Sequence, residues 1–332
     1  MKQIRIDRYG EPPEVARCVP VPDVGEPGAG EVVFDVLAFP INPADLAFCR
    51  GQYRLRPPLP ATPGAECVGR VRAVGTDVAQ FAPGDLVLNL QRENWAQQRR
   101  VPASDLIRLP GAIDLHQAAM LRINPPTALL LLTDIVSLRP GDWVIQNAAN
   151  SSVGKLLIRL ARRRGLKTAN VVRRETLFDD LRALGADACV LDGPGLAERV
   201  ARATGAAPIR LGLDAVGGEA TARLVACVAD EGTVCCYGSM TGEDPALSRS
   251  ELVYRGLSIT GFMLGRFLGR RTPQQIRDVY AELAAQVLAG GLDVPVRAVY
   301  PIEDIGRALA HAMQGSRDGK ILVAPQLPGT NV

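Results

Sequence analysis

The chain changes its pattern of apolar and polar residues close to residue 118. Before this point, short apolar runs typical of strands, EVVFDVLAF at 31–39 and CVGRVRAVG at 67–75, are separated by turn signals such as Pro83-Gly84-Asp85. Beyond Asp142, apolar strand candidates alternate with segments whose apolar residues have helical spacing. We therefore expect a mostly β domain followed by an α/β domain.

The alternation after Asp142 is regular enough to assign elements. Helices are expected at 151–165 and 175–185, and strands at 142–147, 166–172, 187–192, 208–218, 232–239 and 256–262. Repeated strand-helix-strand units favour a parallel, doubly wound sheet.

The two ends of the chain are predicted to build one domain together. Residues 115–138 have helical spacing interrupted by Pro125 and Pro126, and a last helix begins at Thr272-Pro273. The strand candidates at 292–301 and 320–325 are expected to return to the first domain. The predicted domains are 1–118 with 266–332, and 119–265.

Composition excludes several classes of function. The 332 residues are 47% hydrophobic and 22% charged, with a formal net charge of +3 and scattered basic residues, which argues against nucleic-acid binding. The densest apolar run, from Thr127, is too short for a membrane span, and MKQIRIDRYG at the N-terminus lacks the apolar core of a secretory signal. Seven cysteines without a C-x-x-C pair are typical of reduced thiols, so we expect a cytoplasmic protein.

The run QNAANSSVG at 146–154 stands where a dinucleotide-binding turn would carry its glycines. With Gly154 as the third glycine position, Ala149 and Ser151 take the first two; both are small. Asn150 tolerates a left-handed backbone, and Ser151 or Ser152 can cap the following helix, whose free amides suit an anion. An ordinary strand-helix connection is the alternative.

The next strand candidate ends in Arg173 and Arg174, about where an NAD-binding unit places a carboxylate on the ribose. Two guanidinium groups suit the 2'-phosphate of NADP. A solvated strand end, with Glu175 beside it, is the alternative. Together, the turn, the helix and the two arginines favour NADP.

Eight segments carry a resemblance that covers nearly the whole chain. They are INPADLAFCRGQY (41–53), PGAECVGRVRAVGTDV (63–78), PGDLV (83–87), INPPTA (123–128), VIQNAANSSVG (144–154), NVVR (170–173), YGSM (237–240) and GFML (261–264). In these the chain resembles the medium-chain dehydrogenase/reductases, and among them the mitochondrial-type 2-enoyl thioester reductases. The resemblance implies a Rossmann domain that binds NADPH, a GroES-like catalytic domain, and a homodimer paired near SITGFML (258–264).

Zinc-dependent members of that superfamily carry a G-H-E signature, whereas this chain has Gly64-Ala65-Glu66. His116 and His311 are its only histidines. We therefore expect no metal. Alcohol oxidation on this scaffold relies on zinc as a Lewis acid, so reduction of an activated carbon-carbon double bond is the better fit.

Reduction of an enoyl thioester delivers hydride to the β-carbon and a proton to the α-carbon. The family's catalytic tyrosine falls on Tyr53, and a neutral phenol can donate that proton or stabilise the enolate. Tyr53 as a packed loop aromatic is the alternative, and quinone reductases of the superfamily share this tyrosine. The Asn124-Pro125 pair is more typical of the enoyl reductases.

The resemblance also implies the residues that bind ligands. For the cofactor they are Asn124, Asn150, Ser151, Ser152, Val153, Arg173, Arg174, Tyr237, Gly238, Ser239, Met240, Phe262, Met263, Leu264 and Lys320, and for the acyl substrate Trp95 and Asn42. Lys320 as a solvated strand charge, and Trp95 as hydrophobic packing, remain alternatives.

Two departures from the family affect the substrate prediction. Leu129 and Leu130 replace a tyrosine and an arginine, and QRENW (91–95), with Glu93, replaces the usual loop before Trp95. The leading hypothesis is an NADPH-dependent reductase of 2-enoyl thioesters on CoA or acyl carrier protein. A reductase of quinones or free α,β-enones, and a cofactor-binding protein with little catalysis, are the alternatives.

Overall fold

The computed structural model describes residues 1–315 and 319–327 and divides into two compact units. Unit 1 comprises Met1–Ile123 and Arg277–Val332, and unit 2 comprises Asn124–Ile276. The first division comes five residues, and the second eleven residues, after the boundary drawn from the sequence. Helix α3 (Leu115–Ala119) contacts strands of unit 1 and α10 (Leu264–Leu268) contacts α4 of unit 2, so each helix stays with the unit on which it packs.

Unit 2 is built on a six-stranded sheet in which every neighbouring pair is parallel. The spatial order is β10-β9-β8-β11-β12-β13. The strands are β8 (Trp143–Gln146), β9 (Lys167–Val172), β10 (Ala188–Leu191), β11 (Ile209–Asp214), β12 (Thr233–Cys236) and β13 (Ser258–Gly261). Chain order reverses between β8 and β11, which is the arrangement of a doubly wound dinucleotide-binding sheet. The predicted fold class is confirmed.

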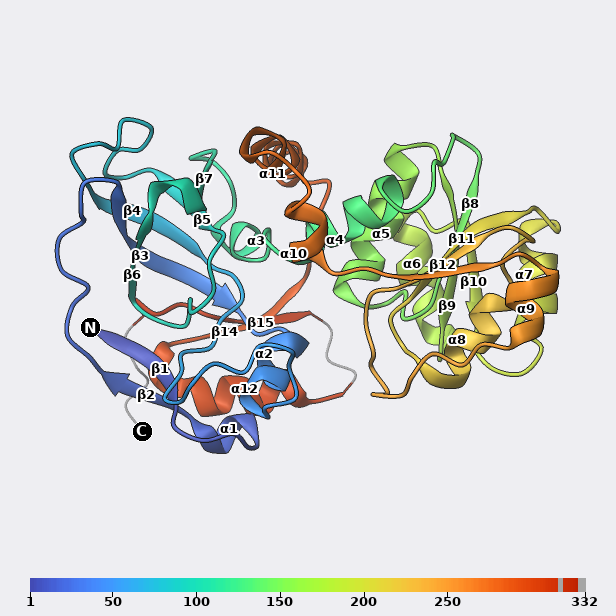
Figure 1. Cartoon of the computed structure of the whole chain (residues 1–332), viewed down its shortest axis with the longest axis horizontal. Coiled ribbons are helices and arrows are strands. Elements are labelled where there is room, and N and C mark those ends of the chain that lie inside the picture. The colour runs from blue at the N-terminus through green and yellow to red at the C-terminus, as the bar shows by residue number, and fades with distance from the viewer. Residues whose placement is uncertain (316–318, 328–332) are drawn as a thin grey trace. The chain divides into compact units, whose positions relative to one another are not determined.

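Helices cover both faces of this sheet (Figure 1). Val171 packs in one cluster with Val200 of α7 and Leu224 of α8, whereas its neighbour Val172 packs in another with Ile158 of α5. Successive strand residues point to opposite faces, so the two clusters lie on opposite sides. The helices are α4 (Asn124–Thr133), α5 (Ser152–Arg163), α6 (Phe178–Leu184), α7 (Leu196–Thr204), α8 (Gly218–Val225), α9 (Arg249–Tyr254) and α10.

The proline pair in the predicted helical segment starts a helix instead of interrupting one. Pro125 and Pro126 occupy the first turn of α4, directly after Asn124. A proline is tolerated there because the first N–H groups of a helix have no intrahelical acceptor. The segment 115–138 therefore forms two helices, α3 and α4, which belong to different units.

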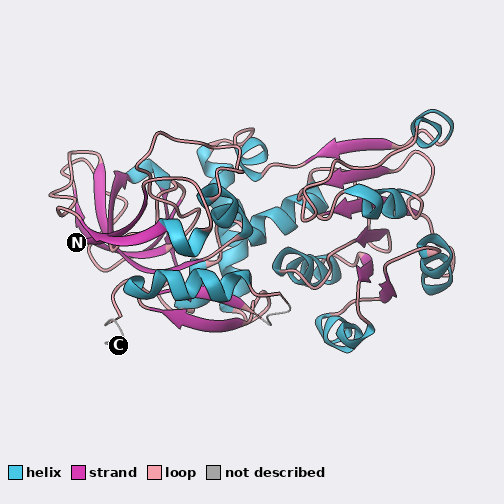
Figure 2. Ribbon diagram, turned by 90° about the horizontal axis from the view of Figure 1, so that it is seen from below, coloured by secondary structure: helices cyan, strands magenta, loops and turns pink. Residues whose placement is uncertain are grey.

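Unit 1 is mostly β, and both ends of the chain contribute to it. Its larger sheet has the order β14-β15-β3-β4-β5-β7, with β6 paired to β3, and β1 pairs with β2 separately (Figures 1 and 2). Its strands are β1 (Lys2–Ile6), β2 (Ala16–Pro20), β3 (Glu31–Pro40), β4 (Val68–Val74), β5 (Leu86–Asn89), β6 (Gln98–Pro102), β7 (Leu106–Leu109), β14 (Val296–Tyr300) and β15 (Lys320–Val323). Its helices are α1 (Pro12–Val15), α2 (Pro43–Cys49), α3 and α12 (Ile305–Met313), and α11 (Pro273–Leu288) enters it from unit 2.

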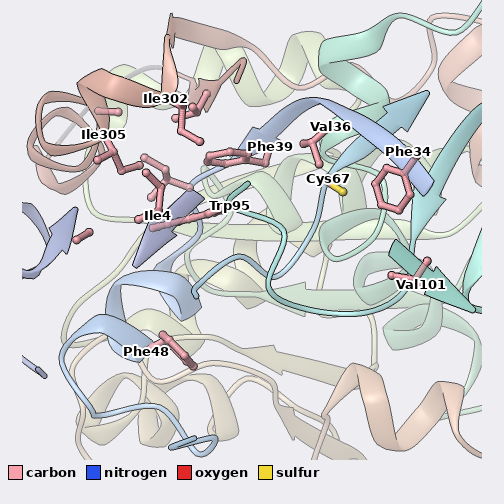
Figure 3. Close-up of a cluster of buried hydrophobic side chains, with 14 of the residues drawn as sticks. Ile4, Phe34, Val36, Phe39, Phe48, Cys67, Trp95, Val101, Ile302 and Ile305 are labelled. Carbon is pink, nitrogen blue, oxygen red and sulfur yellow. The ribbon is translucent and has the colours of Figure 1, made fainter. Parts of the chain in front are cut away.

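The core of unit 1 joins residues from the whole length of the chain. Phe39 and Trp95 stack with ring centroids 5.6 Å apart, and Ile4 from the N-terminal strand and Ile302 and Ile305 from the C-terminal segment belong to the same buried cluster (Figure 3). Burial of such large apolar side chains is the main stabilising term of folding. No helix within residues 1–315 and 319–327 is long and apolar enough to cross a bilayer.

Candidate functional site

Most of the predicted cofactor residues lie at one edge of the unit 2 sheet. The turn 147–151 follows β8, Arg173 and Arg174 follow β9, residues 237–240 follow β12, and residues 262–264 follow β13. Because all six strands are parallel, their carboxyl ends share one edge, where open α/β sheets bind ligands. The fold therefore brings these predicted residues together.

A buried amide network holds the turn that lacks the usual glycines. The Gln146 side-chain amide donates to the carbonyl of Gly154, at 3.0 Å, and to the Asn170 side chain, at 2.8 Å. Asn170 in turn donates to Thr168 and Ala188. Gln146 and Asn170 are fully buried, so their bonds connect β8, β9 and α5 away from water. We did not single out these two amides from the sequence, although polar residues inside apolar strands were the available signal.

Gly154 allows the start of α5 to pack directly against the turn. A Cβ atom at this position would lie 2.5 Å from the carbonyl oxygen of Ala149, closer than real Cβ contacts come. Ala149 is completely buried, and the preceding Ala148 has a left-handed φ of 48°. A non-glycine residue in that conformation is held by its surroundings.

Replacing Gly154 with alanine is therefore expected to lower the free energy of unfolding by about 1–3 kcal/mol, the usual cost of an overpacked position. Denaturant unfolding would measure it. Gly111→Ala is the matched control, because a Cβ there meets nothing within 4 Å. Equal stability of Gly154→Ala and the parent protein would contradict the close approach.

The N-terminus of α5 is arranged to receive an anion. Ser151 caps the helix by accepting a hydrogen bond from the Gly154 N–H at 3.1 Å, and Asn150 just before it is exposed. The N–H groups of Ser152 and Val153, in the first turn, have no acceptor within the helix. Together with the helix dipole, such amides bind phosphate groups.

The hydroxyl of Tyr237 lies at the same turn. It is buried and faces the side chain of Ser151, the residue that caps α5. Burial raises the pKa of Tyr237, so the phenol keeps its proton at neutral pH and remains a donor. A buried donor next to a helix N-terminus fits the oxygen of a bound phosphate.

Asp214 holds the neighbouring segments in position from the end of β11. Its buried carboxylate accepts hydrogen bonds from the side chains of Asn147 and Thr221, and its backbone carbonyl accepts one from Tyr237 N–H at 2.8 Å. Asn147 also accepts a bond from Ala215 N–H at 2.8 Å. Asp214 therefore links the turn after β8 to the segment after β12. We did not identify Asp214 as a residue of the site from the sequence.

The remaining predicted cofactor residues of unit 2 differ in exposure. Arg173 and Arg174 are exposed, as are Gly238, Ser239 and Met240, whereas Asn124 is buried at the start of α4. Phe262 is buried and packs on Phe267 with centroids 4.4 Å apart; Met263 is exposed, and Leu264 begins α10. Leu129 and Leu130, the residues that depart from the family, are both buried on α4.

In unit 1, Tyr53 follows α2 and is partly buried. Its backbone N–H donates to the carbonyl of Ala47 at 3.1 Å, which folds the loop back on the helix. Its ring packs against the unit 1 core and lies under the guanidinium of Arg92, 5.1 Å from the ring centroid. These contacts fix the position of the Tyr53 ring, which carries the hydroxyl.

Asn42 and Lys320, predicted for different ligands, lie together in a buried cluster. The Lys320 ammonium donates to the Asn42 side-chain carbonyl, and the Asn42 amide donates to Glu66 at 2.7 Å. Burial raises the pKa of Glu66 to about 7, against the opposing effect of Lys320. Lys320 is 5% exposed, so it is not a solvated strand charge. The ligand roles of both residues stay predictions.

Trp95 is fully buried and belongs to the unit 1 core (Figure 3). Its ring stacks on Phe39, which is the hydrophobic packing that the sequence left as an alternative. Its indole N–H has no hydrogen-bond partner within the described residues. Contact with an acyl group stays a prediction.

The residues around Glu66 do not fit a zinc ion. Ala65 offers no ligand atom, and burial raises the pKa values of the nearest thiols, Cys49 and Cys67, to about 12, which disfavours the thiolate form that zinc binds. The Lys320 ammonium already faces Glu66. Within residues 1–315 and 319–327, no group of three or more His, Cys, Asp or Glu side chains could hold a metal ion.

Two family models match the chain, one in each kind of domain. Residues 152–285 match the model described as zinc-binding dehydrogenase, and residues 28–111 match the alcohol dehydrogenase GroES-like domain. The first description names a metal for which the residues described above supply no ligand set. The two matches agree with the division into an α/β unit and a mostly β unit.

Curated relatives cover almost the whole chain. The mitochondrial enoyl-[acyl-carrier-protein] reductase of Rattus norvegicus is 34% identical over 92% of this chain and 84% of its own length. The protein of the same name from Caenorhabditis elegans is 32% identical over 94% of this chain and 92% of its own length.

Solved structures show the same fold. An Escherichia coli quinone oxidoreductase complexed with NADPH has a TM-score of 0.88 at 25% identity, covering 98% of this chain and all of its own. A mutant form of the enoyl thioester reductase from Candida tropicalis has a TM-score of 0.85 at 22% identity, covering 97% of this chain and 99% of its own. At 22% identity, the similarity to the Candida tropicalis enzyme shows only that the fold is the same.

Proposed function

We propose that this chain, which belongs to the medium-chain dehydrogenase/reductase superfamily and within it to the family of the mitochondrial enoyl-[acyl-carrier-protein] reductases, reduces the carbon-carbon double bond of 2-enoyl thioesters with NADPH. The observation that carries the proposal is the carboxyl edge of the unit 2 sheet. There a capped helix N-terminus and a buried phenol lie at the turn after β8, and two exposed arginines follow the neighbouring strand β9.

The residues at this edge fit NADPH. The amides of Ser152 and Val153 and the hydroxyl of Tyr237 would hold the pyrophosphate, because the first-turn amides have no acceptor within the helix and the phenol is a buried donor beside them. Arg173 and Arg174 would hold the 2'-phosphate, since guanidinium groups bind phosphate oxygens in pairs. When bound, NADPH supplies the hydride that adds to the β-carbon.

Tyr53 is the proposed catalytic residue of unit 1. Addition of hydride at the β-carbon moves the double-bond electrons toward the thioester carbonyl and leaves an enolate. The Tyr53 hydroxyl stabilises the enolate oxygen or gives its proton to the α-carbon, and water returns the proton to the phenol. Neither step uses a metal, and Gly64-Ala65-Glu66 has an alanine in place of the histidine of the G-H-E signature.

Reduction of a quinone is the second candidate, because the Escherichia coli relative of the same fold is named a quinone oxidoreductase. The two candidates share the hydride donor and differ in the acceptor. The curated relatives at 32–34% identity favour the thioester.

Steady-state assays of the purified protein with NADPH would test the proposal, with crotonyl-CoA, a crotonyl carrier protein, 1,4-benzoquinone and cyclohexenone as acceptors. We expect kcat/KM to be highest for one of the thioesters and unchanged after EDTA treatment. Comparing kcat/KM for the two thioesters shows whether CoA or the carrier protein is the preferred acyl carrier. Preferential turnover of benzoquinone would replace the proposal with the second candidate, and turnover of none would leave a cofactor-binding protein.

We also propose a homodimer that forms through β13. This strand is the last of the unit 2 sheet, and its four residues are exposed. On the neighbouring α9, Val253 is 62% and Tyr254 81% exposed. An exposed edge strand with apolar neighbours invites pairing with a second copy.

Light scattering should give twice the mass of the chain for the parent protein. Ile259→Lys should give the monomer, because a charged side chain on an edge strand opposes pairing. Leu288→Lys, at an exposed leucine of α11, is the matched control and should stay dimeric. A monomeric parent protein would refute the dimer.

A further inference from the structure

Arg92 is a charged residue beside Tyr53 to which the proposed reaction has given no role. It lies in the loop between β5 and β6, inside the run QRENW that departs from the family pattern. Its guanidinium carbon is 5.1 Å from the centroid of the Tyr53 ring and 5.9 Å from that of Phe48. The cation therefore faces two aromatic rings, one of which belongs to the proposed acid.

The loop holds Arg92 in a defined position. Asn94 is fully buried, accepts a hydrogen bond from the Asn89 side chain at 2.7 Å and donates one to the carbonyl of Gln91 at 2.7 Å. Glu93 has a left-handed φ of 65° and forms an ion pair with Arg99 at 3.3 Å. A non-glycine residue rarely adopts that conformation, so the surrounding bonds must hold the loop in this shape.

The charge of Arg92 is only partly neutralised within the protein. Its Nη2 lies 3.9 Å from Oδ1 of Asp45, longer than a hydrogen bond, and this buried nitrogen has no hydrogen-bond partner within the described residues. The two oxygens of Asp45 already accept the backbone N–H groups of Asn42 and Ala65, each at 3.0 Å. The Arg92 side chain is 25% exposed.

The surroundings add further positive charge. Arg122 is partly buried and donates to the carbonyls of Ala65 and Leu90, and Lys320 lies beside Glu66. Three cations, Arg92, Arg122 and Lys320, thus face two carboxylates, Asp45 and Glu66. A region with surplus positive charge stabilises negative charge that develops near it.

We infer that Arg92 is a positioning residue for the reaction, which fixes the Tyr53 ring and stabilises the negative charge that forms when the phenol donates its proton. The inference rests on the proposed function, because it needs Tyr53 to act as the donor. In that step the Tyr53 O–H bond breaks and a C–H bond forms at the α-carbon, while the hydride has formed the C–H bond at the β-carbon. The charge left on the phenol oxygen is the one that Arg92 stabilises until water returns a proton.

A double-mutant cycle on the best acceptor tests this role. We expect Arg92→Gln to lower kcat by roughly tenfold, with KM for NADPH within about twofold, because its action is on the chemical step. In the Tyr53→Phe background the same substitution should lower kcat by less than about twofold. Arg92→Lys, which keeps the charge without the planar stacking group, should recover part of the loss.

Arg100→Gln is the matched control for loss of a positive charge. Arg100 lies on β6 in an exposed ion pair with Glu31 at 3.4 Å, so kcat should stay within about twofold of the parent value. Melting temperatures of all variants report whether the loop still folds. Should Arg92→Gln fail to fold, Arg92→Met, which keeps the aliphatic stem over Phe48, takes its place in the cycle.

Equal losses of kcat in both backgrounds would overturn the inference, since Arg92 would then only hold the loop. An unchanged kcat in Arg92→Gln would overturn it as well. A parent protein without turnover on any acceptor would refute the proposed function, and with it the role of Arg92. A parent protein that turns over a 2-enoyl thioester best leaves the proposed function standing whichever way the cycle falls.

Discussion

Replacing Tyr53 with phenylalanine is expected to lower kcat on the best 2-enoyl thioester by roughly 10²-fold or more, the usual effect of losing a general acid or an oxyanion donor. The substitution removes one hydroxyl and keeps the ring, so its packing on the unit 1 core and its contact with Arg92 are retained. NADPH affinity should stay within a few-fold, because the proposed nucleotide contacts come from unit 2. Stopped-flow and steady-state kinetics with calorimetric NADPH titration would measure both quantities.

Tyr300→Phe is the matched control for this substitution. The Tyr300 hydroxyl pairs with His311 Nδ1 at 2.9 Å, so its loss should reduce stability slightly and leave turnover unchanged. If the Tyr53→Phe protein reduced its best substrate at nearly the parent rate, Tyr53 would be a packed loop aromatic. The proton would then come from water or another group.

Replacing Arg173 with alanine is expected to remove most of the preference for NADPH over NADH. The parent protein should bind NADPH more tightly by about 1.5–3 kcal/mol, the scale of a charge-assisted hydrogen bond, or roughly 10- to 150-fold in Kd. Arg173 is exposed at the carboxyl end of β9, so its side chain is accessible to a 2'-phosphate. NADH affinity should hardly change, because NADH lacks that phosphate.

Arg202→Ala is the matched control for Arg173. Arg202 is exposed in the last turn of α7, and helices in strand-helix-strand units run back toward the amino ends of the strands. Its loss should leave both affinities unchanged. Equal affinity of the parent protein for the two cofactors in calorimetry would end the assignment of Arg173 and Arg174 to the 2'-phosphate.

The elements of unit 2 were predictable because their patterns are local. The spacing of Val153, Leu156, Leu157, Leu160 and Ala161 indicated α5, and the capping serine and Gly165 marked its ends. The apolar run before Arg173 indicated β9 in the same way. In contrast, the pair Pro125 and Pro126 was read as an interruption, because a proline that breaks one helix and a proline that starts the next have the same local signal.

The candidate site was predictable where motifs are contiguous and was missed where contacts are distant in sequence. QNAANSSVG and the two arginines after β9 indicated the nucleotide turn, and the structure places them at one sheet edge. Gln146 and Asn170, 24 residues apart, and Asn147 and Asp214, 67 apart, form the bonds that hold that turn. No periodicity relates such pairs, so only the register of the parallel strands brings them together.

By itself, the sequence determined the two kinds of domain, the family, and the lack of the G-H-E histidine at residues 64–66, and it predicted the nucleotide turn with its arginines. The tertiary structure decided the strand order, the burial of Lys320 against Asn42 from 278 positions away, and the placement of Arg92 over Tyr53. The physical reason is the range of the interactions. Helical and strand periodicity, caps and turns act within a few residues, whereas burial and charge depend on which distant segments the sheets bring into contact.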